Sequence, residues 1–109
     1  SLITHSYGQI SRIVYRISND ANVKVVLLPP GIVDPDSVAA ITLTPTQLQP
    51  ARDGGGAQID YTVEWKGYAV TDPNGITVST EGDYTYAIVA TLPNTSYTSV
   101  YRGVLNLYR

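Results

Sequence analysis

The amino-acid sequence predicts an all-β protein, built as a sandwich or a small barrel from about seven or eight mostly antiparallel strands. Residues 57–65 carry the clearest signal, because apolar and polar side chains alternate there with the period of a half-buried strand. The apolar face of this segment holds Ile59, Tyr61, Val63 and Trp65. Similar short runs recur between turn residues, and none of them has a convincing helical period. We expect a single domain, residues 1–109, with a core that needs no disulfide or metal.

The first quarter of the chain predicts an N-terminal arm followed by a β-hairpin. Residues 1–8 are short and mostly polar, and residues 9–18 alternate as a strand. One face of that strand holds Ile13, Tyr15 and Ile17. Residues 19–22 are rich in Asn and Asp, which favour turns because they bond their own backbone. Residues 23–28 are apolar on both faces except at Lys24, which indicates either a central strand or a strand covered by a partner.

Prolines and glycines divide the middle of the chain. Residues 38–43 predict another short strand. Residues 44–56 contain Pro45, Pro50 and three successive glycines, so we expect a long exposed loop, with one helical turn near residues 46–48.

The last third of the chain predicts a hairpin and two long strands. Residues 68–70 and 76–78 flank an Asp-Pro-Asn-Gly sequence, which favours a type I turn between paired strands. Residues 84–92 and 97–108 then alternate as strands. Gly103 interrupts the apolar face of the final strand, which indicates a bulge or a close contact.

These strand faces define a candidate core and a candidate interface. The core prediction comprises Ile59, Tyr61, Val63, Trp65, Tyr84, Tyr86, Ile88 and Leu105. The interface prediction comprises Leu2, Ile3, Tyr7, Tyr97, Tyr101 and Tyr108. The first three lie in the arm, and the others lie on a final strand that we expect at a sheet edge, where unpaired backbone groups can bind a neighbouring chain.

Composition argues against several classes of function. Charged residues make up 15% of the chain, below the roughly 25% of an average domain, and the net charge is −2. Basic residues are scattered, so we expect no nucleic-acid partner, and no apolar run is long enough to span a membrane. With no Cys and with His5 as the single histidine, we expect no metal, no cofactor and no nucleophile–histidine arrangement. We therefore predict that the protein is not an enzyme.

The remaining polar motifs have simple structural interpretations. Asp60 and Glu64 share a strand face, and about four residues of strand rise separates them too widely for a typical catalytic carboxylate pair. Asp34 and Asp36 lack the spacing of a calcium loop, so a turn is favoured. The glycines at residues 54–56 are not followed by the Lys of a phosphate-binding loop, and we expect a flexible loop tip.

Several residues resemble those of a known family. The segment of residues 82–90, Gly-Asp-Tyr-Thr-Tyr-Ala-Ile-Val-Ala, resembles the sixth strand of immunoglobulin-like sandwiches, and Trp65 resembles their core tryptophan. The Tyr-Thr-Val-Glu-Trp run at residues 61–65, the Gly-Ile-Thr-Val-Ser run at residues 75–79 and the Tyr-rich strands after them are similar to small Cys-less immunoglobulin-like domains of tailed-bacteriophage virion proteins. The resemblance covers residues 59–109.

This resemblance implies an immunoglobulin-like β-sandwich that acts as a structural protein of the virion. It would decorate a bacteriophage head or connect tail or neck parts, with other virion proteins or copies of itself as partners in a multimeric assembly. An alternative interpretation is a carbohydrate-binding or cell-surface-binding module of an adhesin or secreted enzyme, located outside the cell or on its surface. Exposed tyrosines are compatible with both interpretations.

Overall fold

The computed structural model describes residues 2–6, 11–65, 68–70, 76–78 and 82–108, and these residues form strands and connections without a helix. The predicted all-β class is confirmed. One hydrogen-bonded sheet has the order β1 (Leu2–Ser6), β9 (Thr98–Tyr108), β8 (Gly82–Thr91), β3 (Ala21–Leu28) and β4 (Ile41–Gln49). A second sheet pairs β2 (Ser11–Tyr15) with β5 (Tyr61–Trp65), and a third pairs β6 (Tyr68–Val70) with β7 (Ile76–Val78).

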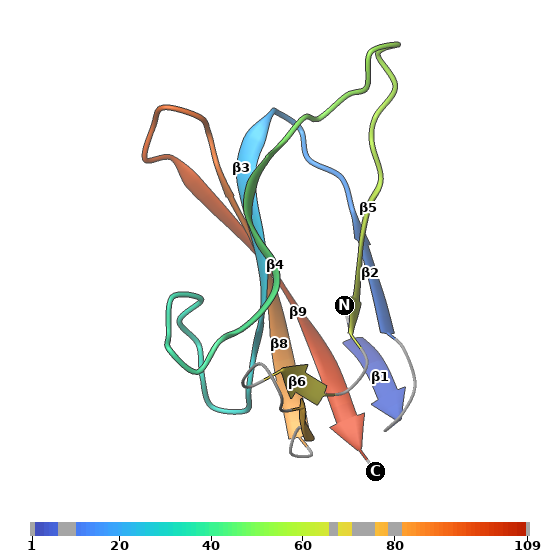
Figure 1. Ribbon diagram of the computed structural model, residues 1–109, viewed down its shortest axis with the longest axis vertical. Helices are drawn as coiled ribbons and strands as arrows, with labels where there is room; N and C mark the ends of the chain where they lie inside the picture. The colour runs from blue at the N-terminus through green and yellow to red at the C-terminus, as the bar shows by residue number, and fades with distance from the viewer. Residues whose placement is uncertain (1, 7–10, 66–67, 71–75, 79–81, 109) are drawn as a thin grey trace.

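The β2–β5 pair lies over one face of the larger sheet, and the core fills the space between them (Figure 1). Inward-facing side chains come from both layers because successive residues of each strand point to opposite faces. The buried cluster contains Ile13, Tyr15, Val63 and Trp65 from the small sheet and Val23, Val25, Leu27, Tyr84, Tyr86, Ile88 and Leu105 from the large one. Trp65 is 3% exposed, and its ring centroid lies 5.3 Å from that of Tyr84.

The two layers contain fewer strands than predicted. Six strands (β2, β3, β4, β5, β8 and β9) make up the two antiparallel layers, fewer than the expected seven or eight. Of the other three strands, β1 extends the larger sheet by pairing in parallel with β9, and β6 and β7 form a separate hairpin. This one parallel pairing among the described strands agrees with the predicted, mostly antiparallel arrangement. That hairpin was predicted from its turn sequence and is confirmed, although residues 71–75 of the turn lie outside the described residues.

The predicted hairpin of the first quarter is wrong. β2 pairs with β5, residue 11 opposite residue 65, whereas β3 pairs with β8 and β4. The chain between β2 and β3 therefore crosses from one layer to the other. Asp20 helps to place this crossing, because its Oδ1 accepts a 2.9 Å hydrogen bond from the backbone N–H of Ala51. β2 and β3 each have an apolar face. In separate layers these faces can pack against each other, whereas in one hairpin they would lie side by side.

The predicted loop at residues 44–56 is also wrong in its first half. The strand expected at residues 38–43 is β4, which begins at residue 41 and ends at residue 49. It therefore includes residues 46–48, where one helical turn was expected. Pro45 is tolerated because β4 is the edge strand of the large sheet and its pairing with β3 contains register shifts.

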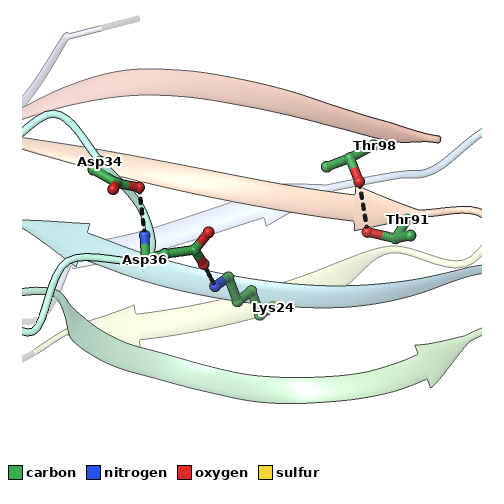
Figure 2. Close-up of polar contacts among 5 residues, drawn as sticks. All are labelled: Lys24, Asp34, Asp36, Thr91 and Thr98. Atoms are coloured by element: carbon green, nitrogen blue, oxygen red, sulfur yellow. Dashed lines mark hydrogen bonds and ion pairs between the residues drawn. The ribbon is translucent and has the colours of Figure 1, made fainter. Parts of the chain in front are cut away.

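β3 is a central strand, which explains why it is apolar on both faces. Val26 and Leu28 face away from the core and are buried in a second cluster with Ala87, beneath the connection of residues 29–40. That connection is tethered to this outer face, because Lys24 binds Asp36 and the Asp36 N–H donates to Asp34 Oδ1 (Figure 2). The chain itself therefore covers the second face of β3.

The predicted core residues lie mostly where the alternation put them. Six are buried: Val63, Trp65, Tyr84, Tyr86, Ile88 and Leu105. Tyr61 is partly buried against the core, whereas Ile59 precedes β5 and lies outside the buried cluster. Gly103 marks a close contact and not a bulge, because it pairs in register with Tyr86 and the Tyr86 ring occupies the space where a side chain would stand.

Candidate functional site

The two layers are linked by tyrosines along the β4 side. Tyr15 and Tyr61 are cross-strand partners whose rings stack with centroids 5.4 Å apart. The Tyr15 hydroxyl donates a 2.7 Å hydrogen bond to Oε1 of Gln49, which is 3% exposed, and the Tyr61 hydroxyl donates to the carbonyl of Pro50 at 2.6 Å. These bonds satisfy a buried amide oxygen and join β2 and β5 to the end of β4.

Burial raises the pKa of Tyr15 above its usual 10.0, with a smaller opposing effect from the Gln49 hydrogen bond and a further raising effect from Tyr61. A raised pKa means that the folded state retains this proton when the unfolded state has lost it. The free energy of unfolding should therefore hold up to about pH 10 and fall as the pH rises further. Urea unfolding between pH 8 and pH 11.5, roughly the range that brackets tyrosine ionisation, checks this. In the Tyr15→Phe variant, the free energy of unfolding should decrease less at alkaline pH.

The layers are open on the opposite side, where a groove of about 670 Å³ separates β2 from β8 and β9. One wall is the continuous run of residues 13–19. The other wall comprises Tyr86, Ile88, Ala90 and Leu92 of β8 and its exit, together with Tyr97, Thr98, Ser99 and Tyr101. The groove is an extension of the core that β2 and β5 do not cover.

Two of the predicted interface tyrosines lie on this groove. Tyr97 is 74% exposed and Tyr101 is 57% exposed, and the Tyr101 ring packs at 6.4 Å from that of Tyr86. Large exposed aromatic side chains beside a groove are typical of interaction surfaces.

Among the described residues, the lining of the groove contains none of the other four predicted interface residues. Leu2 and Ile3 lie in β1, with backbones opposite residues 104 and 105, and Tyr108 ends β9 opposite Ser6. Tyr7 lies outside the described residues. The expectation that β9 is a sheet edge is wrong for its second half, because β1 pairs with residues 104–108. Residues 98–103 have no described partner on that side.

Asp60 and Glu64, which share a strand face, each bind a different arginine. Arg12 Nε donates to Glu64 Oε1 at 3.3 Å across the outer face of β2–β5, and Arg16 binds Asp60 and donates to Gln58 Oε1. The hydrogen bond from Arg16 lowers the pKa of the Asp60 carboxyl. Each carboxylate is thus matched with its own arginine at the surface, an arrangement that contributes little to stability.

In the glycine-rich loop of residues 54–56, the neighbouring carboxylate of Asp53 has a structural role. Asp53 Oδ1 accepts hydrogen bonds from the backbone N–H groups of Gly55 and Ala57, at 2.8 and 3.0 Å. The Asp53 N–H in turn donates to the Ala57 carbonyl at 2.8 Å. The loop expected to be a flexible tip therefore contains a turn organised by one carboxylate.

Among the described residues, no three His, Cys, Asp or Glu side chains are grouped so that they could hold a metal ion. No helix suited to crossing a membrane occurs in this part of the chain.

We expect a chelator such as EDTA to leave the melting temperature unchanged in a thermal unfolding scan. A decrease of several degrees would reveal a bound metal that stabilises the fold.

Residues 13–19, Thr98 and Ser99 were not predicted as parts of a site. The first segment was interpreted only as a strand with a core face, and nothing local indicates that its layer leaves part of β8 and β9 uncovered.

Comparison with known proteins adds no relative: no family model matches the chain, and no curated protein or solved structure gives a significant match.

Proposed function

We propose that this protein is a non-enzymatic attachment module with an immunoglobulin-like β-sandwich, which binds other proteins through the groove beside β9. The observation that carries this proposal is the pair of exposed tyrosines, Tyr97 and Tyr101, on a wall of a groove that both apolar and polar residues line. Aromatic side chains of this kind supply large contact area at a low cost in conformational entropy.

The strand order supports the immunoglobulin-like assignment. The sequence β4–β3–β8–β9 in one sheet corresponds to strands C′, C, F and G of such domains, and the β2–β5 pair corresponds to B and E. In this correspondence the tyrosine-rich β8 is strand F, as the sequence resemblance implies. Trp65 then lies on strand E, whereas immunoglobulin domains have their tryptophan on strand C, the place of β3, so the expected likeness of Trp65 to that tryptophan does not hold in this correspondence.

The resemblance to Cys-less phage domains suggests the setting: a virion, in which the module decorates the head or connects tail or neck parts and occurs in many copies. Immunogold electron microscopy of particles from the source of this protein tests the setting. We expect regularly spaced label on heads or tails. Particles that carry no label, with the protein free in solution, would contradict a virion role.

A carbohydrate-binding module is the second candidate, since exposed tyrosine rings next to the hydroxyls of Thr98 and Ser99 could stack on and hydrogen-bond a sugar. A glycan array separates the two functions. Specific binding to one sugar class, abolished by Tyr97→Ala, would favour the second candidate. Absence of sugar binding together with labelled particles would favour protein attachment.

A further inference from the structure

We propose that the pairing of β1 with β9 is a mechanical clamp, which lets this protein carry tension along its chain without losing its fold. The tension enters at the start of β1 and leaves at the end of β9. This inference rests on the proposed attachment function, because a module that connects two parts of a particle is loaded whenever those parts are pulled apart.

The β1–β9 ladder has the geometry that resists such a load. Residues 2–6 of β1 pair in parallel with residues 104–108 of β9, in a register that is unbroken over all five residue pairs. The two strands therefore point the same way (Figure 1). A force that pulls Leu2 backwards and Tyr108 forwards acts along the two strands in opposite directions. The evenly spaced hydrogen bonds of a parallel ladder are then loaded together, and they must break together.

β9 is anchored on its other side, which opposes sliding under the load. It pairs with β8 in unbroken register over residues 98–107. Leu105, within the clamped part of β9, is fully buried in the core. Gly103 adds a lock, because the Tyr86 ring fills the space beside it. If β9 moved along β8, a residue with a side chain would have to take the place of Gly103 against that ring.

The clamp keeps the load away from the rest of the fold. While the ladder holds, the force passes from β1 directly to β9, and the chain that connects these two strands is not stretched. Most of the groove lining lies on β2, on β8 and on the chain that follows each of them. The protein can therefore keep a partner bound in the groove while it carries tension.

Single-molecule force measurements test the clamp by pulling the whole protein in two directions. The chain contains no cysteine, so introduced cysteines attach the handles at chosen positions. Handles at Ser1→Cys and Arg109→Cys load the ladder along the strands. Handles at Ser1→Cys and Val104→Cys open it from one end, because Val104 lies opposite Leu2 and is partly exposed. At equal loading rate, the first rupture along the strands should need at least about twice the force, because the residue pairs break together and not one at a time.

Two proline variants locate the resistance in the ladder. Successive residues of a strand direct their N–H groups alternately to one side and the other. Of Ile3→Pro and Thr4→Pro, one therefore removes a hydrogen bond to β9, and the other is its matched control. The first should lower the rupture force along the strands by at least about one fifth, the share of one residue pair in five. A force that neither variant changes would overturn the clamp.

Ile13→Val is the control for general stability. Ile13 is buried in the core but lies on β2, outside the path of the force. This variant should lower the urea midpoint and leave the rupture force along the strands unchanged. Equal forces in the two pulling directions, or a force that follows the urea midpoint and not the ladder, would contradict the proposal.

The outcome for the broader function is separate, because the force measurements need no partner. If the two pulling directions give equal forces while particles are regularly labelled, the clamp fails and the attachment function stands. If particles carry no label, the virion role fails, whatever force the isolated protein withstands.

Discussion

Replacing Trp65 with Ala should lower the free energy of unfolding by about 3–5 kcal/mol, as expected when a buried large aromatic leaves a cavity. The side chain is almost completely enclosed between the two layers and packs against Tyr84, so little rearrangement can fill the space. Urea unfolding followed by circular dichroism measures the change, since the variant has lost the only tryptophan as a fluorescent probe.

Val14→Ala is the matched control for this change. Val14 lies on the neighbouring strand β2 but is 60% exposed on its outer face, so its truncation should cost less than about 1 kcal/mol. A Trp65→Ala loss below about 1 kcal/mol would show that the β2–β5 layer contributes little to the stability of the fold.

Replacing Gly103 with Ala should lower the free energy of unfolding by about 1–3 kcal/mol, although removing a glycine from a strand usually stabilises it. The reason is the Tyr86 ring, which lies across Gly103 on the paired strand, so that an added methyl group would overlap its far end. Tyr86 is itself buried and contacts Tyr101, which limits how far the ring can move.

A double-mutant cycle isolates this contact. In a Tyr86→Leu background, which lacks the far end of the ring, Gly103→Ala should cost less than about 0.5 kcal/mol. Gly54→Ala serves as a control, because nothing lies near the added methyl group there and its effect should stay within about 0.5 kcal/mol. Equal costs for Gly103→Ala in both backgrounds would mean that the ring is not the obstacle.

The Gly103 contact shows what a local pattern can and cannot predict. The break in the apolar row of the last strand indicated either a bulge or a close contact, and the choice depended on Tyr86, which is distant in sequence. Trp65 shows what alternation can predict. The inward faces of two strands distant in sequence placed Trp65 and Tyr84 in one predicted core, and their ring centroids lie 5.3 Å apart.

The groove could not be predicted, because it depends on what β2 and β5 leave uncovered. Tyr97 and Tyr101 were recognised as interface candidates from their residue type and their place on the last strand. Their exposure arises because the small layer has two strands and the large sheet has five. Nothing in residues 13–19 indicates that they form the facing wall.

The sequence by itself determined the all-β class, the inward faces of β2, β5 and β8 and the β6–β7 hairpin, because side-chain alternation and turn chemistry act between residues close in the chain. Only the tertiary structure decided the pairing of β2 with β5, the strand conformation at Pro45 and the parallel pairing of β1 with the second half of β9. Those features depend on which distant strands bury their apolar faces together and which backbone groups find partners, and neither is encoded within one segment.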